Sequence, residues 1–339
     1  MTLQHSDEQI LQLVQEYMKG SSNPDFVGYR EQTRMKDIPE AWSRFLWSLK
    51  HISKLGRYHN KRILDIGCGC GWHAFVLSLL DRTNQIVGVD ILPSMVEGMN
   101  DCIRHMQAQG ASFDLTGICC DICNADLPPE SFDAIFSNEA IEHIHDMEQM
   151  VDRCRSLLKP NGTMILINDQ NIYNHEVHKE INEMWEKREH SWEWSEYLRK
   201  LRPIEHGNAK PFAVMREEIV RAANPALDDT SIRAIVEATP GLLKPEIETI
   251  AINFKNSASL PKRKEIDWCR NPETGEYAER LFDPFELANM IQERGFRAKA
   301  RHFFRRFPLN LANSIQFQPL NKMLFNMRPL FVIYAEKQA

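Results

Sequence analysis

The middle of the chain alternates short runs of aliphatic and β-branched residues with longer amphipathic stretches. From Arg62 the apolar runs RILDIG, QIVGVD, FDLTGI, FDAIFS and TMILIN are separated by stretches of helical periodicity. Such alternation is typical of a parallel sheet flanked by helices. It stops near Asp169 and resumes at Asp283, with a helix over PFELANMIQERG and strands over FRAKARHFF and PLFVIYAE. The pattern therefore predicts an α/β core made of two segments of the chain.

Two further regions lack the strand pattern. Residues 170–282 are mainly helical in pattern and are too long for a structureless loop. The first sixty residues show helical spacing in two sets, Ile10, Leu11, Val14 and Met18, then Trp42, Phe45, Leu46, Leu49 and Ile52. We therefore predict an N-terminal helical cap at 1–59, a core at 60–169 and 283–339, and a helical insertion at 170–282 after the fifth strand.

Composition and charge narrow the class of protein. The 339 residues are 43% hydrophobic and 26% charged, as in ordinary globular domains. The 47 acids exceed the 41 bases and give a net charge of -6, which does not favour a nucleic-acid partner. No apolar run reaches the ~20 residues that span a bilayer, and MTLQHSDEQI does not resemble a signal peptide. We expect a soluble, cytoplasmic protein without nucleic-acid or membrane partners, and the sequence leaves a homodimer open.

The cysteines and histidines do not form a metal site by spacing. Eight cysteines in a chain of this length are not a disulfide scaffold, so free thiols are expected. Cys120 and Cys123 have CxxC spacing, but no second CxxC or nearby HxxxH supplies the remaining ligands of a zinc site. His175 and His178 stand three residues apart on a charged helix, which is more often plain surface. The sequence therefore predicts no metal.

The first predicted strand ends in a glycine-rich turn followed by a helix. Gly67, Gly69 and Gly71 allow the backbone to approach a ligand closely, and the helix N-terminus offers unpaired N–H donors. Asp90 ends the second strand about 20 residues later, where a carboxylate can accept hydrogen bonds from both hydroxyls of a ribose. Together the turn and the acid predict a ligand that contains an adenosine.

Five motifs in order, ILDIGCGCG, IVGVD, GICCD, SFDAIFSNEAIEHI and LLKPNGTMILI, resemble those of class I S-adenosylmethionine-dependent methyltransferases. The resemblance covers roughly residues 60–169 and 283–337. It implies a Rossmann-like class I methyltransferase fold with S-adenosyl-L-methionine as the methyl donor. It also implies that the following residues bind the donor: Asp65, Gly67, Cys68, Gly69, Gly71, Asp90, Ile91, Asp121, Ile122 and Asn138.

The resemblance assigns parts of the donor to individual residues. The three glycines would flank the methionine portion and Asp90 the ribose. Asp121 and Ile122 would hold the adenine, with the neighbouring Asp126 as an alternative to Asp121. Asn138 would lie near the donor carboxylate or the acceptor. We expect Asp65 to organise the glycine turn rather than to react.

The segment after the fourth predicted strand lies on the acceptor side. His143 has an ordinary pKa suited to removing a proton near neutral pH, and Glu139 is the second candidate catalytic residue. In relatives of this EHI pattern the histidine often fixes the loop, so a structural role stays open. The insertion should recognise the acceptor, and its candidate contacts are Tyr173, His175, His178, Trp192 and Trp194.

The predicted function is transfer of a methyl group to an oxygen or nitrogen of a small-molecule acceptor, such as a metabolite, sugar or natural product, by in-line displacement. SNEAI stands where nucleobase methyltransferases of this superfamily carry an Asx-Pro-Pro-aromatic motif, which disfavours a nucleobase acceptor. One alternative is an NAD-dependent oxidoreductase, although its glycine spacing differs from GCGCG. The other is a catalytically inactive module that binds the donor and acts by interaction.

Overall fold

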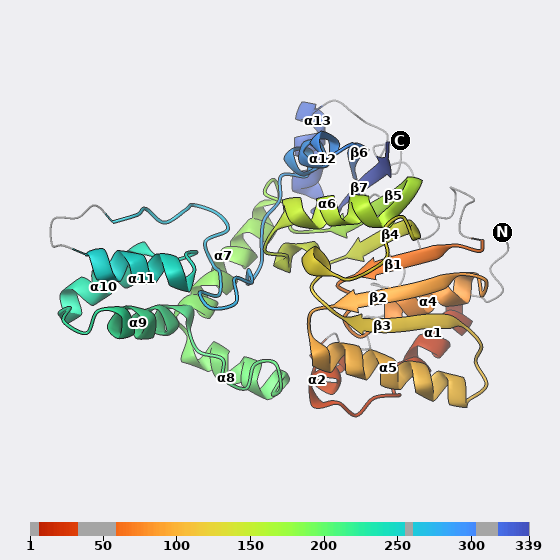
Figure 1. Ribbon diagram of the computed structural model, residues 1–339, viewed down its shortest axis with the longest axis horizontal. Helices are drawn as coiled ribbons and strands as arrows, with labels where there is room; N and C mark the ends of the chain where they lie inside the picture. The colour runs from red at the N-terminus through yellow and green to blue at the C-terminus, as the bar shows by residue number, and fades with distance from the viewer. Residues whose placement is uncertain (1–6, 33–58, 255–259, 303–317, 339) are drawn as a thin grey trace.

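The computed structural model describes residues 7–32, 59–254, 260–302 and 318–338 (Figure 1). The second set of apolar positions in the expected cap, between 42 and 52, lies outside the described residues. Within them, one sheet has the strand order β3-β2-β1-β4-β5-β7-β6. Its strands are β1 (Arg62–Ile66), β2 (Gln85–Asp90), β3 (Asp114–Cys119), β4 (Phe132–Asn138), β5 (Leu158–Asn168), β6 (Phe296–His302) and β7 (Phe331–Lys337).

The direction of the strands defines where a ligand can bind. Strands β1 to β5 run parallel, while β7 runs antiparallel to both β5 and β6. The chain order reverses between β1 and β4, and open α/β sheets bind ligands beyond the carboxyl ends of the strands at such a reversal. The α/β, Rossmann-like fold expected from the sequence is confirmed.

Helices cover both faces of this sheet. Successive strand residues face opposite sides, so Ile63 and Leu64 of β1 enter different apolar clusters. One cluster holds Phe75 and Met99, and the other holds Met150. The core helices are α4 (Trp72–Leu80), α5 (Pro93–Ala108), α6 (Met147–Leu157), α12 (Pro284–Glu293) and α13 (Gln318–Met327). The sequence pattern did not predict α13.

Two N-terminal helices, α1 (Asp7–Tyr17) and α2 (Pro24–Gln32), pack against the core. The buried Tyr17 hydroxyl donates a hydrogen bond to the carbonyl of Cys70, in the glycine turn, at 3.0 Å. The buried carboxylate of Asp25 accepts a hydrogen bond from the Ser94 hydroxyl at 2.9 Å. The N-terminal helices are therefore attached to the same end of the sheet as the glycine turn.

A series of helices follows β5 and precedes α12 in the chain. These are α7 (His175–His190), α8 (Trp192–Leu201), α9 (Phe212–Ala223), α10 (Asp229–Ala238) and α11 (Lys244–Asn253). Figure 1 shows α7 beyond the arrowheads of β2 and β3, with α9, α10 and α11 standing farther from the sheet. The three outer helices form an apolar cluster of their own around Ile219, Ile232 and Ile247. Helix α8 instead returns to pack against α2.

Among the described residues, no helix has both the length and the apolar character needed to cross a membrane.

The contact between α2 and α5 generates a stability prediction. Replacing a helical glycine by alanine ordinarily stabilises a helix by roughly 1 kcal/mol. A Cβ on Gly98 of α5 would lie 2.4 Å from the Phe26 ring, so steric repulsion should reverse the sign. We expect Gly98→Ala to lower the free energy of unfolding by ~1 to 3 kcal/mol in urea titrations.

A double-mutant cycle supplies the control. In a Phe26→Ala background the ring is gone and only the Cβ of residue 26 remains close, at 2.9 Å, so the same Gly98→Ala change should cost less than in the unmodified chain. Equal effects in both backgrounds would show that α2 does not pack on Gly98.

Candidate active site

The glycine turn after β1 is shaped by left-handed backbone conformations. Gly67 and Gly69 have φ values of 65° and 51°. A Cβ on Gly67 would lie 2.3 Å from the Cβ of Ala140, so Gly67 lets the loop after β4 approach the turn. A Cβ on Gly69 would meet no atom within 4 Å. The backbone at Gly69 is therefore open to direct contact with a ligand.

Asp90 holds this turn against the end of β2. Its Oδ2 atom accepts a hydrogen bond from the Gly69 N–H at 2.8 Å, and its Oδ1 atom accepts one from the Leu92 N–H at 3.0 Å. Burial raises the pKa of Asp90 although these two N–H groups oppose the rise. A carboxylate offers about four acceptor positions, so two remain for further donors. Ile91, next in the chain, is apolar yet 61% exposed.

Asp65 does not organise the turn as expected, because Asp90 accepts the turn's N–H group instead. Asp65 is 2% exposed, and its Oδ2 atom has no hydrogen-bond partner among the described residues. Burial and then the charge of Asp90 raise the pKa of Asp65. Cys68 is also buried, and its Sγ lies 3.5 Å from the sulfur of Met99. Burial raises the pKa of this thiol, which makes it unreactive.

Asp121 begins a short 3-10 helix, η1 (Ile122–Asn124), after β3. Its carboxylate accepts hydrogen bonds from the Cys123 N–H at 2.9 Å and the Asn124 side-chain amide at 3.0 Å. Ile122 is buried below it.

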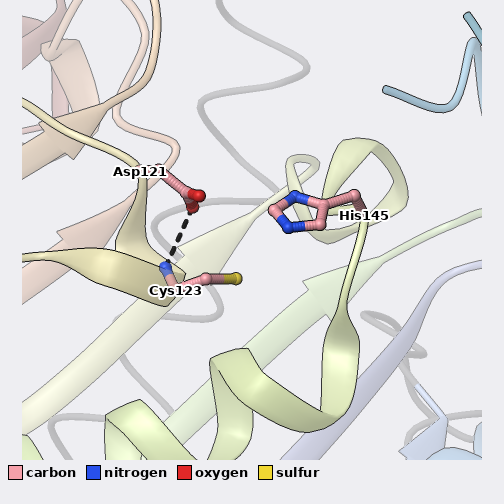
Figure 2. Close-up of side chains that lie close together, drawn as sticks. All are labelled: Asp121, Cys123 and His145. Carbon is pink, nitrogen blue, oxygen red and sulfur yellow. Dashed lines mark hydrogen bonds between the residues drawn. The ribbon is translucent and has the colours of Figure 1, made fainter. Parts of the chain in front are cut away.

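A histidine that the sequence did not place here lies beside Asp121 and Cys123. Ligand atoms of Asp121, Cys123 and His145 lie within 4.8 Å of one another, and Figure 2 shows the side chains of Cys123 and His145 pointing toward each other, from η1 and from the loop before α6. The spacing of residues in the sequence did not predict that His145 joins Asp121 and Cys123, because His145 comes from the segment after β4. Burial and the charge of Asp121 raise the pKa of the Cys123 thiol to about 12. The Cys123 thiol is therefore protonated at neutral pH, and a metal would have to displace this proton in order to bind the sulfur.

The segment after β4 begins with a conformation that is rare for its residue type. Asn138 ends the strand, and Glu139 has a φ of 50°, a left-handed value that non-glycine residues seldom adopt outside turns and functional sites. The Glu139 N–H donates to the carbonyl of Ile167 at 2.9 Å, and its Oε2 accepts from the Asp169 N–H at 3.4 Å. These contacts connect Glu139 to the carboxyl end of β5.

His143 ends the 3-10 helix η2 (Ile141–His143) and lies among acidic groups. Ligand atoms of Glu142, His143 and Glu279 lie within 4.8 Å of one another, and His143 remains in contact with solvent. Glu142 is buried and accepts a hydrogen bond from the Asn168 amide at 2.6 Å. The Oε2 atom of Glu279 is buried with no hydrogen-bond partner among the described residues.

The neighbouring acids change the proton affinity of His143. Partial withdrawal from water lowers its pKa. The carboxylates of Glu142, Glu279 and Glu276 outweigh that effect and raise the pKa of His143 to about 9. Burial raises the pKa of Glu142 and Glu279 in turn. His143 is therefore an imidazolium at neutral pH, whereas the sequence argument assumed an unshifted histidine.

A family model described as a methyltransferase domain matches residues 64–166, the segment that carries the glycine turn, Asp90 and the loop after β4. Residues 64–166 are therefore a methyltransferase domain. The resemblance read from the motifs is thereby confirmed.

The chain matches its curated relatives over only part of their length. The chain is 32% identical over 144 residues to a ubiquinone biosynthesis O-methyltransferase of Bradyrhizobium diazoefficiens, covering 42% of this chain and 50% of that protein. It is 32% identical over 105 residues to an uncharacterized methyltransferase of Mycobacterium bovis, covering 31% and 49%. The chain thus spans about half the length of these relatives.

Solved structures similar to the methyltransferase include the YcgJ protein of Bacillus subtilis. Its TM-score is 0.44 at 13% identity, over 86% of this chain and 98% of that one. A phosphoethanolamine N-methyltransferase of Haemonchus contortus gives 0.42 at 14% identity, over 82% and 49%.

The acceptor residues expected from the methyltransferase sequence do not form one wall. The Tyr173 hydroxyl donates to the carboxylate of Asp283, and its ring stacks on Phe325 beneath α12 and α13. His175 is exposed in the first turn of α7, and His178 is half-buried one turn later. On α8, Trp192 is 52% exposed, while Trp194 lies under the ammonium group of Lys187 at 5.7 Å from the ring centre.

Charged residues of the insertion act on the His143 cluster electrostatically. The pKa of Glu276 responds to His143 and to three groups of the insertion, Glu205, Arg188 and Arg202. The sequence did not predict these four charged residues. They come from separate segments that carry no motif, and only aromatic and histidine residues of the insertion were candidates for acceptor contacts.

Removing one acid tests the assignment of the raised pKa. Glu279→Gln removes a negative charge beside the imidazolium, so the pKa of His143 should fall from about 9 by ~1 unit. The measurement is an NMR titration of the imidazole carbon-bound protons between pH 5 and 10. Glu273→Gln, an exposed change in the same loop, is the matched control and should leave the His143 pKa in place.

The remaining charged groups around His143 also bear on this titration. Glu142, Glu276 and Asp90 stay in place, and Arg280 donates to the nearby Ile144 carbonyl at 3.2 Å. An unchanged His143 pKa in Glu279→Gln would show that Glu279 does not face the imidazole.

Proposed function

We propose that the chain transfers the methyl group of S-adenosylmethionine to an oxygen or nitrogen of a small organic acceptor at the carboxyl edge of the sheet. The observation that carries the proposal is the Gly69 turn held by Asp90, beside the exposed Ile91, inside a methyltransferase domain. The Bradyrhizobium relative is named as an O-methyltransferase, which favours oxygen as the receiving atom. Bound at this edge, the donor supplies an electrophilic methyl group on a sulfonium.

The residues at this edge fit the chemistry of the donor. The unpartnered buried oxygen of Asp65 suits the ammonium group of the methionine portion. The free acceptor positions of Asp90 suit the ribose hydroxyls. The exposed Ile91 suits an adenine face, because covering it removes apolar surface from water.

The residues beyond β4 suit the handling of a proton. An in-line displacement depends mainly on alignment, and a base is needed only where the receiving oxygen or nitrogen carries a proton. Burial raises the pKa of Glu279 to about 8, which matches a proton acceptor working near neutral pH. We therefore propose that Glu279 takes the proton from the acceptor. Before this step, the positive charge of His143 stabilises the carboxylate form of Glu279. Glu139, joined to the end of β5, would orient the acceptor.

The two alternative functions predict different ligands or activities at the carboxyl edge of the sheet. An oxidoreductase would bind a nicotinamide cofactor, and an inactive module would bind the donor without turnover. An acceptor other than nucleic acid, a cytoplasmic location and a homodimer remain proposals from the sequence.

The binding experiment is calorimetry with S-adenosylmethionine and its product S-adenosylhomocysteine. Asp90→Ala removes a charged acceptor from the ribose site and should weaken both ligands ~10- to 100-fold. Asp114→Ala, an exposed acid at the start of β3, is the matched control and should bind as the unmodified chain does. Urea unfolding of each variant checks that the fold persists.

Turnover completes the test. Methyl transfer from labelled donor to a panel of phenols, hydroxy acids and amines should be detectable with the unmodified chain and lost in step with donor affinity in Asp90→Ala. Donor binding without transfer would favour the inactive module. Equal affinity of Asp90→Ala and the unmodified chain would refute the assignment of the ribose site.

A further inference from the structure

Arg188, in the last turn of α7, is a half-buried cation with no ion-pair partner among the described residues. Its guanidinium carbon lies 4.8 Å from the centre of the Phe212 ring. Its Nη1 atom is buried and has no hydrogen-bond partner, and no carboxylate in the described part of the chain forms an ion pair with it. Burial lowers the pKa of Arg188, so nearby acids do not compensate for the lost hydration.

The residue after Arg188 on α7, Glu189, forms an ordinary buried ion pair with an arginine. Glu189 is buried and pairs through both carboxylate oxygens with the buried Arg216 of α9. A paired guanidinium–carboxylate is the usual way to bury an arginine, since an unpaired buried charge is costly. Arg188 departs from that arrangement within one residue of it.

One of the two acids that influence Arg188, Glu205, is already engaged with other cations. Glu205 accepts a hydrogen bond from Arg202 at 2.9 Å, and its other oxygen lies 3.2 Å from the His206 ring. Glu276 influences the pKa of Arg188 but lies beyond ion-pair distance of it. Arg202 and His206 therefore have a carboxylate partner, whereas the charge of Arg188 is available to a ligand.

Two observations place Arg188 on the acceptor side of the donor turn. Trp185, one turn before Arg188 on α7, donates its indole N–H to the carbonyl of Glu279 at 3.0 Å, and ligand atoms of Glu279 and His143 lie within 4.8 Å of each other. In addition, the backbone N–H groups of Ile204 and Glu205 each donate to the buried Asp25 carboxylate at 2.8 Å. Asp25 also accepts from Ser94, at the start of α5. The segment at 204–205, which follows α8, is thus fixed to the core just beyond Asp90.

We propose that Arg188 binds an anionic group of the methyl acceptor, so that the acceptor is a small organic acid or a phosphate monoester. The inference rests on the proposed function and names the substrate class for the same site. A planar guanidinium matches a carboxylate or phosphate through two parallel hydrogen bonds, which a neutral acceptor does not supply. The stacked Phe212 ring fixes the plane of the guanidinium without using its N–H donors.

The test measures acceptor binding by calorimetry to protein saturated with S-adenosylhomocysteine. The probes are matched pairs: hydroxybenzoates with hydroxybenzamides, hydroxy and amino acids with their amides, and phosphate monoesters with their parent alcohols. In at least one pair the acid should bind ~10- to 100-fold more tightly than its neutral partner. The pair in which the acid binds more tightly shows whether the site prefers a carboxylate or a phosphate.

Variants assign that preference to Arg188. In Arg188→Gln the acid and its neutral partner should bind within about threefold of each other, and Arg188→Lys should keep only part of the preference, because an ammonium lacks the planar fork. Lys179→Gln removes an exposed charge from the same helix and should keep the full preference. Urea unfolding of Arg188→Gln without ligand should show equal or greater stability, because an unpaired half-buried charge is removed.

The outcomes separate this inference from the proposed function. If no acid binds better than its neutral partner, or the preference survives Arg188→Gln, the anion site is refuted while donor binding stands. If Arg188→Gln unfolds, the cation supports the fold and the inference fails as well. If the unmodified chain does not bind S-adenosylhomocysteine, the proposed function itself fails.

Discussion

The hydrogen bond from the Gly69 N–H to the Asp90 carboxylate is the contact on which the proposed site depends. It joins the turn after β1 to the end of β2 at the carboxyl edge of the parallel strands. Gly67 brings the loop after β4 against the same turn, because its missing side chain admits Ala140. Three neighbouring strands therefore deliver their loops to one place. The sheet supplies the rigid support, and the loops supply the chemistry.

The acceptor side is built from segments far apart in the chain. The buried Asp25 of α2 accepts hydrogen bonds from the start of α5 and from the segment after α8. Because unsatisfied buried donors are costly, this carboxylate fixes the helices after β5 to the N-terminal helices and the core together. Glu205 owes its position to that attachment.

The sequence predicted the parts of the fold that depend on local pattern. The strands and the core helices other than α13 follow from hydrophobic periodicity, and the glycine turn follows from three closely spaced glycines. Asp65 and Asp90 look alike in sequence, and only their three-dimensional positions decide which one holds the turn. The pKa of His143 was not predictable either, since Glu276 and Glu279 approach it from more than a hundred residues away.

The central claim is that the donor lies at the edge formed by the glycine turn, Asp90 and the loop after β4. Hydrogen exchange of the unmodified chain with and without S-adenosylhomocysteine tests it directly. The account requires slower exchange in 66–71, 90–92 and 138–143, with no change in 212–253 of the outer helices. Protection confined to 212–253, or no protection at the edge under saturating ligand, would contradict it.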